Sequence, residues 1–220
     1  MNHAVLFVAL ALAAPAAAED FKTNPDAGNN VFTAVFDAKL GERITAQSSA
    51  VGCDLTFDEK TGTASGACSV PLTSIKVDNE ETKTEHFQQW VTNKKSEPKD
   101  CHLEAKLVDV KVGKLAPEQP ATFAAQIPFT VCGRGPTDGR KEHLKGTALL
   151  FPPGAYGEKK TIRIRAAIPD FDRDAYHIGP KYTEGWLARV QSLAKVVAEK
   201  GTVELSLFAK SEGEKAASAQ

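Results

Sequence analysis

The sequence is poor in methionine and cysteine and has almost no net charge. Its single Met is the first residue, so once that residue is removed the chain has no thioether to bind copper or haem iron. With 27 Lys and Arg against 28 Asp and Glu, the formal net charge is -1. This balance provides no positive field to attract phosphates, so the composition gives no support to general nucleic-acid binding.

Familiar catalytic motifs are missing as well. The chain has no G-x-S-x-G, no H-E-x-x-H, no P-loop, no dinucleotide fingerprint and no C-x-x-C. Residues 170–174 (DFDRD) do not have the Gly and Glu spacing of an EF-hand loop. The histidines that follow the N-terminal segment are too scattered to form a metal-binding pair: His86, His102, His143 and His177. We therefore expect no metal, no cofactor and no enzyme activity.

Long apolar runs are confined to the N-terminus. Residues 4–14 are apolar, Pro15 follows, and three alanines lead to Glu19. Such a run with an A-x-A step after it is typical of a secretory signal peptide, and it is too short to span a bilayer as a helix. We predict cleavage after Ala18 and a periplasmic or secreted protein without a transmembrane segment. A buried N-terminal helix is the alternative.

The rest of the chain has the composition of one globular domain. Over all 220 residues, hydrophobic residues make up 42% and charged residues 25%, which is near the average for soluble proteins. We divide the chain into a signal peptide (1–18), an N-terminal linker (19–29), a folded domain (30–210) and a disordered tail (211–220). Within the domain, the Gly- and charge-rich residues 133–146 are expected to form a solvated hairpin turn.

Apolar and polar residues alternate along most of the domain, as in strands with one buried face. In residues 31–38, for example, Phe32, Ala34 and Phe36 share a face. Further strand-like runs are residues 44–57, 63–77, 102–112, 122–131, 146–151, 162–168 and 203–207. Most gaps are too short for parallel crossovers, so we expect about eight antiparallel strands, closed into a barrel or stacked as a sandwich.

Two segments have the period of a helix instead. Residues 82–93 place Phe87 and Trp90 on one face. Residues 183–199 begin with Thr183 as a candidate N-cap and continue with an apolar stripe. We expect both helices to cap the sheet or pack against it.

An even number of cysteines in an oxidising compartment favours disulfides. The first two flank a strand–turn–strand pattern in which residues 58–62 supply the turn. Folding about this turn pairs Phe57 with Ala64 and places Cys53 opposite Cys68. Residues directly opposite on antiparallel strands have Cβ atoms ~4.5–5.5 Å apart, close to the separation that a disulfide needs.

The other two cysteines fit the same pattern. Strand-like runs lie on either side of the loop GKLAPEQP. Folding about this loop sets Leu107 against Gln126 and brings Cys101 opposite Cys132. We predict that both disulfides are structural.

Several stretches of the chain resemble the YceI-like, polyisoprenoid-binding family. Residues 57–87 contain a strand, a D-x-x-x-G turn, a second strand with the pattern SG...V...SI, and then a His next to an apolar residue, here His86. Residues 127–146 are similar to the family's glycine-containing central hairpin. Residues 163–179 and 202–210 are similar to its last two strands. The four cysteines are not a general trait of the family.

The resemblance implies an all-β, antiparallel, lipocalin-like barrel of about eight strands with one or two short helices. It also implies a lumen that holds an isoprenoid chain, such as a polyprenyl or quinone tail. A barrel of eight strands is about the smallest that can hold a small ligand, and apolar inward faces suit a hydrocarbon chain. The candidate lumen residues are Phe32, Phe36, Val108, Val110, Phe123, Ile127, Phe129, Ile162 and Ile164.

We therefore predict a non-catalytic lipid-binding protein whose partner is an apolar lipid. The alternative is a structural or interaction domain without a ligand, in which the same apolar residues fill a closed core. A third class is an enzyme that uses His102, His143 or His177 as a base near the mouth of the lumen. The sequence leaves the oligomeric state open, with a homodimer as one option.

Overall fold

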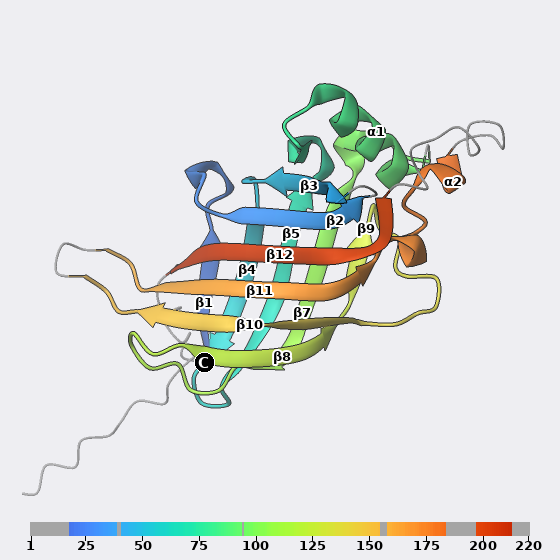
Figure 1. The fold of residues 1–220 in the computed structure, drawn as a ribbon. Helices are drawn as coiled ribbons and strands as arrows, with labels where there is room; N and C mark the ends of the chain where they lie inside the picture. The colour runs from blue at the N-terminus through green and yellow to red at the C-terminus, as the bar shows by residue number, and fades with distance from the viewer. Residues whose placement is uncertain (1–17, 39–40, 94, 155–157, 184–196, 213–220) are drawn as a thin grey trace, which may run out of the picture.

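The computed structural model describes residues 18–38, 41–93, 95–154, 158–183 and 197–212 (Figure 1). In this part of the chain, twelve strands belong to one antiparallel sheet, and two α-helices are short. The strands are β1 (Ala18–Thr23), β2 (Val31–Ala38), β3 (Arg43–Ser48), β4 (Gly52–Asp58), β5 (Thr63–Pro71), β6 (Lys76–Val77), β7 (His102–Lys111), β8 (Ala121–Ile127), β9 (Phe129–Val131), β10 (Glu142–Phe151), β11 (Thr161–Asp172) and β12 (Val197–Ser211). The α-helices are α1 (Glu81–Thr92) and α2 (Pro180–Thr183).

The long strand β12 joins two layers of the sheet. One edge of β12 pairs with β11, and the other edge pairs first with β2 and then, through residues 209–211, with β1. In Figure 1 the strands β2, β12, β11, β10 and β8 run across the view, while β1, β4, β5 and β7 cross behind them at a steep angle. Layers that cross in this way are connected at their corners by strands that belong to both, and β12 forms one such corner.

The second corner lies at Pro128, which separates β8 from β9. β8 pairs with β10 along its whole length, whereas β9 pairs with β7. Proline has no N–H to donate to a ladder, and the chain passes from one layer to the other at this residue. The strands form a barrel-like ring that is incomplete between β7 and β8. The prediction of an antiparallel, all-β barrel with one or two short helices is confirmed.

The β4–β5 hairpin has the predicted register. Phe57 pairs with Ala64, and Cys53 pairs with Cys68. The two cysteines are bonded, with their Cα atoms 4.1 Å apart. Asp58 begins the turn, and its Oδ1 accepts hydrogen bonds from the backbone N–H groups of residues 60 and 61. The sequence of the turn therefore sets the position of this disulfide.

The second disulfide is also confirmed, but the hairpin predicted around it is wrong. Cys101 and Cys132 are bonded, with their Cα atoms 4.5 Å apart. β7 pairs with β9 in a register one residue away from the predicted one. Leu107 does not pair with Gln126, because the chain has changed layer at Pro128 and β8 pairs with β10 instead.

Several expected segment boundaries also differ. The expected strands 44–57 and 63–77 are each divided, into β3 and β4 and into β5 and β6. The expected linker 19–29 contains most of β1 and a 3-10 helix, Pro25–Ala27. The polar segment AEDFKT is a strand because β12 and β4 pair with its two edges.

The two predicted helices have different outcomes. The helix expected at 82–93 is confirmed as α1. Of the helix expected at 183–199, residues 197–199 belong to β12, and residues 184–196 lie outside the described residues. Residues 1–17 of the expected signal peptide and residues 213–220 of the expected tail also lie outside them.

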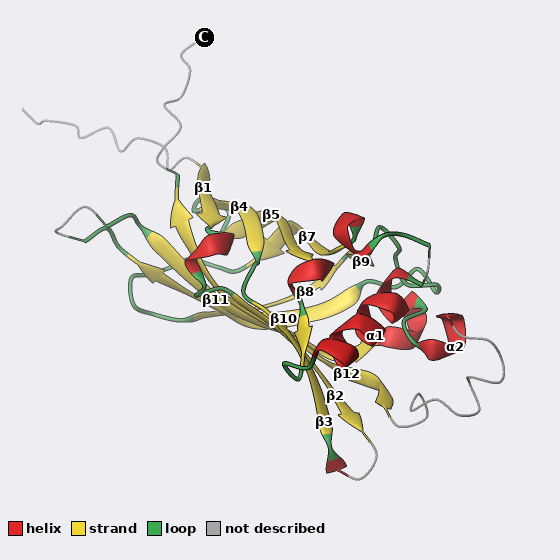
Figure 2. Ribbon diagram, turned by 90° about the horizontal axis from the view of Figure 1, so that it is seen from above, coloured by secondary structure: helices red, strands yellow, loops and turns green. Residues whose placement is uncertain are grey.

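The barrel has two different ends. We call one the helix end, because α1, α2 and the 3-10 helix Arg173–Tyr176 gather there, as Figure 2 shows for α1 and α2. We call the other the hairpin end, because the β4–β5, β7–β8 and β10–β11 connections meet there. At the hairpin end, Lys160 Nζ lies 2.6 Å from Glu19 Oε2 and 2.8 Å from Glu59 Oε1, which links three segments of the chain.

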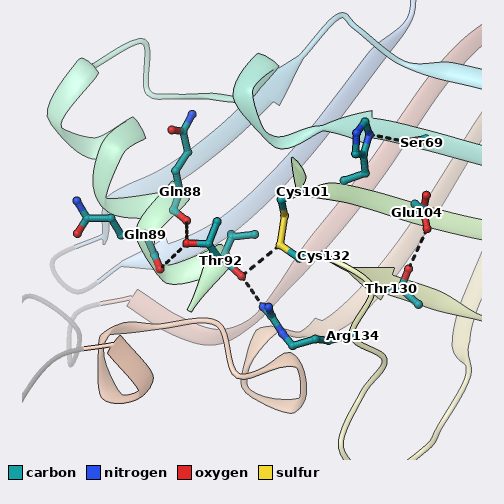
Figure 3. The surroundings of a disulfide bond; sticks show 11 residues. Ser69, Gln88, Gln89, Thr92, Cys101, Glu104, Thr130, Cys132 and Arg134 are labelled. Carbon is teal, nitrogen blue, oxygen red and sulfur yellow. Dashed lines mark hydrogen bonds between the residues drawn. A yellow bond between two sulfur atoms is a disulfide. The ribbon is translucent and has the colours of Figure 1, made fainter. Parts of the chain in front are cut away.

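A residue beside the second disulfide holds the last turn of α1 at the helix end (Figure 3). The Arg134 guanidinium donates a hydrogen bond to the carbonyl oxygen of Val91, in the last turn of α1. Cys132 Sγ lies 3.6 Å from the same oxygen. Carbonyl groups in the last turn of a helix have no partner within the helix, and a cation there is favourable. Part of the segment 133–146, expected as a solvated turn, therefore has a structural role.

Candidate ligand-binding lumen

A cavity of ≈ 80 Å³ runs between the two layers of the sheet. Its wall includes Leu103 and Ile168 toward the helix end, and Val112 and Leu115 toward the hairpin end. Inward side chains from both layers contribute to it, because every second residue of a strand points to the same face. The cavity therefore lies along the interior of the barrel.

The structure places most of the predicted lumen residues at this cavity. Seven of them belong to its wall: Phe32, Val110, Phe123, Ile127, Phe129, Ile162 and Ile164. Phe36 is buried but lies elsewhere in the core, where its ring covers Gly201 so closely that a Cβ there would be 2.5 Å from Phe36 Cδ1.

The prediction for Val108 is wrong, because its side chain is 70% exposed on the outside of the barrel. The β5–β7 ladder is interrupted between the pairs Gly66–Leu107 and Ala64–Val110. This bulge gives β7 one extra residue, so that Leu107 and Val110 both reach the cavity wall. Strict alternation of inward and outward residues could not reveal it.

A residue in the left-handed region marks the bulge. Asp109 has φ +47°, and its N–H donates a 2.9 Å hydrogen bond to Ser65 Oγ. The Ser65 hydroxyl in turn donates to Asp109 Oδ1 at 3.1 Å. Asp tolerates this backbone conformation better than a β-branched residue does. The Asp between two valines was the only local signal for the bulge.

Small residues at inward positions create the space. One row of paired residues across the front layer reads Phe123, Gly146, Ala166, Leu205 and Phe32. Ala166 lets the wall recede, whereas the ring of Phe123 fills the space above Gly146, where a Cβ would lie 2.8 Å from Phe123 Cζ. Ala64, Ala105 and Ala148 act like Ala166 elsewhere in the wall. A prediction from large apolar residues alone misses these positions, although Gly or Ala at alternate positions of a strand was a usable signal.

The cavity wall offers almost no hydrogen-bonding side chain. Among the described residues that form the wall, Thr56 has the only polar side chain other than the disulfide-bonded Cys68. Its hydroxyl is already engaged, since it donates a 2.7 Å hydrogen bond to Asp20 Oδ1. A polar ligand group would lose its hydration here without compensation. The interior suits hydrocarbon.

Aromatic rings close the lumen at the helix end. Phe129, which belongs to the cavity wall, makes edge contacts with Phe171 and Tyr176, with ring centroids 5.5 Å and 5.8 Å away. Phe171 and Tyr176 stack at 5.0 Å. The Tyr176 hydroxyl donates a 2.8 Å hydrogen bond to the buried carboxylate of Glu142. Burial and this hydrogen bond raise the pKa of Tyr176 well above its ordinary value.

The histidines do not form a site. His86 and His143 are exposed on different elements, and His102 Nδ1 lies 3.1 Å from the Ser69 hydroxyl. His177 packs against the ring of Tyr182, with centroids 4.5 Å apart. In the described residues, no group of three or more His, Cys, Asp or Glu could hold a metal ion. None of the described helices is both long and apolar enough to cross a membrane.

Comparison with known proteins identifies the fold. No family model and no curated protein sequence matches the chain. A solved structure described as a polyisoprenoid binding domain from Saccharophagus degradans, implicated in plant cell wall breakdown, matches with a TM-score of 0.55. The match covers 88% of this chain and 98% of that chain, at 14% sequence identity. At this identity the two proteins share a fold, and the likeness extends across nearly all of the barrel.

Proposed function

We propose that this protein is a non-catalytic binding protein that holds an isoprenoid or another long apolar lipid chain in its lumen. The observation that carries the proposal is the apolar wall of the cavity, in which the one hydroxyl is bonded to a neighbouring strand. The fold shared with a polyisoprenoid binding domain supports an isoprenoid chain as the ligand.

The size of the cavity favours a slender chain. Its volume of ≈ 80 Å³ is well below the ~300–1,000 Å³ of pockets that bind drug-sized molecules. A single chain segment suits this space better than a ring system does, and a longer chain requires side chains of the wall to move apart. Each CH₂ group removed from water stabilises the complex by ~0.8 kcal/mol. A chain of several isoprene units can therefore bind tightly without polar contacts.

The same observations count against a domain that only docks onto a partner. Such a domain would have a filled interior and an exposed apolar patch of several hundred Å². Here the interior contains a cavity, and Val108 is the one exposed large apolar side chain among the described residues.

A periplasmic or extracellular location is part of the proposal. Two disulfides support it, one between β4 and β5 and one between the residues beside β7 and β9, because disulfides persist in oxidising compartments. The apolar run 4–14 followed by small residues also supports it. N-terminal sequencing of the protein secreted by its host should begin at Glu19. A chain that retains Met1 would contradict this part of the proposal.

Lipid extraction tests the function directly. We expect organic extracts of the purified protein to contain an isoprenoid or another long-chain lipid, identified by mass spectrometry. Geranylgeraniol added to delipidated protein should raise its melting temperature, since a ligand at 100 times its Kd stabilises the folded state by ~2.7 kcal/mol. The proposal fails if no lipid is extracted and neither geranylgeraniol nor a linear C20 alcohol raises the melting temperature.

A further inference from the structure

The ring of strands is interrupted on one side by a seam between β7 and β8. We define the seam as residues 107–111 of β7 and residues 122–127 of β8. Among the described residues, these two segments share no ladder pair and no backbone hydrogen bond. The last bond between the two layers here joins the Lys106 N–H to the Pro128 carbonyl oxygen at 3.0 Å. The bulge at Asp109 lies within the seam.

Only side chains separate the cavity from the outside along this seam. Leu107 and Val110 from β7, and Phe123 and Ile127 from β8, all belong to the cavity wall. Val108 lies between the first two and is 70% exposed, so apolar surface continues from the interior to the outer margin of the seam. Side chains can change rotamer without breaking backbone hydrogen bonds, which makes the seam easier to open than a paired edge.

At the hairpin end of the seam, one side chain of the β7–β8 loop reaches the cavity. Leu115, in the loop between β7 and β8, is half-buried and reaches the cavity, while most of its neighbours in the loop are exposed. Few backbone bonds hold the loop. The N–H groups of Val112 and Gly113 both donate to the carbonyl oxygen of Gly62 at 3.0 Å, and the Glu118 N–H donates to that of Leu150 at 3.0 Å.

The helix end is held much more firmly. The Cys101–Cys132 disulfide and the stacked aromatic rings close it. Arg173 is buried there and donates hydrogen bonds to the carbonyl oxygens of Ile178 (2.7 Å), Val197 (3.0 Å) and Ala198 (3.0 Å). Opening this end would leave a buried guanidinium without its acceptors, which is costly. The two ends therefore differ in what must be broken.

We infer that an apolar chain enters and leaves the lumen sideways, through the β7–β8 seam, with Leu115 as the side chain that closes it. This inference rests on the proposed function, because it concerns exchange of the same ligand. A polar head group finds no partner inside the lumen, so it stays outside the seam while the chain lies within. Lipid exchange then needs no unfolding of the helix end.

A cross-link across the seam tests the route. Lys111→Cys with Ala124→Cys places exposed thiols on both strands of the seam, and a short bismaleimide joins them. The matched control is Asp54→Cys with Ala67→Cys, an exposed pair that is directly opposite in the hydrogen-bonded β4–β5 ladder. The probe is farnesol carrying a dansyl group on its oxygen, and its uptake and release are followed by stopped-flow fluorescence.

We expect the cross-link across the seam to slow both uptake and release about tenfold, because it blocks a conformational step that limits both rates. The Kd should stay within a factor of about two, since both rates change together. The control cross-link should change neither rate. Equal rates in the two cross-linked proteins would refute the seam as the route, whereas probe that fails to bind the unmodified protein would refute the proposed function itself.

A second variant tests the role of Leu115 without a cross-link. Leu115→Ala should speed both uptake and release of the dansyl-farnesol probe, because the side chain that closes the seam is shortened. Lys114→Ala, on the exposed side of the same loop, is the control and should leave both rates unchanged. If Phe171→Ala at the helix end changes the rates and Leu115→Ala does not, the chain leaves through the helix end and the inference is wrong.

Discussion

The Tyr176 hydroxyl donates a 2.8 Å hydrogen bond to Glu142 Oε1, and both side chains are at least 95% buried. The bond connects the start of β10 to the 3-10 helix at the helix end. Arg140 Nε lies 3.5 Å from the same carboxylate oxygen. A buried carboxylate needs such partners, because it has lost its hydration. This small network positions the aromatic rings that close the lumen.

Tyr176→Phe should lower the free energy of unfolding by about 1–3 kcal/mol, because the Glu142 carboxylate loses the closer of these two donors while it stays buried. Urea unfolding at pH 7 measures the change. The double variant with Glu142→Gln should be less destabilised than the sum of the two single variants, since the two groups interact directly. Additive effects would show that the hydrogen bond contributes little.

Removing the first disulfide should be nearly as costly as removing the second. Cys53→Ala with Cys68→Ala opens a loop of 15 residues and should lower the free energy of unfolding by about 3 kcal/mol. Cys101→Ala with Cys132→Ala opens a loop of 31 residues and should cost about 0.6 kcal/mol more on the same chain-entropy model. Urea titrations of both variants give the comparison. A first disulfide that costs much more than the second would contradict it.

Gly66 cannot be replaced by alanine without a shift of the backbone. Its φ is +143°, and a Cβ there would lie 2.1 Å from the Asp54 carbonyl oxygen in β4. Gly66→Ala should therefore destabilise the fold by roughly 2 kcal/mol or more. Gly135→Ala is the matched control, because a Cβ there meets no atom within 4 Å. Thermal unfolding of the two variants should differ clearly, and equal melting temperatures would refute the argument.

Filling the cavity should weaken lipid binding and leave the fold intact. Ala105 belongs to the cavity wall, whereas Ala67 is exposed on the neighbouring strand β5. We expect Ala105→Leu to weaken binding of the dansyl-farnesol probe at least about tenfold, a loss of about 1.4 kcal/mol, because the added side chain occupies the space of the chain. Ala67→Leu should bind like the unmodified protein. Equal affinity of the two variants would mean that the probe binds elsewhere.

The β4–β5 turn should contribute to the acid sensitivity of the protein. The hydrogen bond from the Thr61 backbone N–H has the largest effect on the pKa of Asp58 and lowers it below the ordinary 3.8. Burial opposes this effect, and the hydrogen bond from the Lys60 N–H adds to it. A lowered pKa in the folded state means stabilisation that is present above pH 3.8 and is lost as the pH falls through the folded value. In melting curves from pH 7 to pH 2, the difference in melting temperature between Asp58→Asn and the unmodified protein should be smallest at the lowest pH. A constant difference would contradict this.

Local signals made parts of the fold predictable from the sequence. The turn residues at 58–62 set the register of β4 and β5, and with it the Cys53–Cys68 disulfide. β1 was missed because its segment is short and polar, and its two partner strands lie far away in the chain. Such strands are defined by tertiary pairing more than by their own residues.

The lumen was predictable only in part, for a related reason. Alternation placed Phe123 and Ile127 correctly, because β8 is a regular strand. It misplaced Val108, because the bulge at Asp109 depends on a hydrogen bond with Ser65 from another strand. The space itself comes from Ala166 and similar small residues of the wall, whose effect depends on which side chains face them across the sheet. The alternation of residues along one strand does not show which side chains those are.

The position of β12 has a consequence for how the chain folds. Phe21 in β1 pairs with Ser211 in β12, so strands from opposite ends of the described chain are direct neighbours in the sheet. Three edges, those of β1, β2 and β11, remain unpaired until β12 docks. Pairing between strands so far apart in sequence is slow, and open edges invite aggregation during the delay. These three strand edges therefore stay open until the last strand of the sheet is in place.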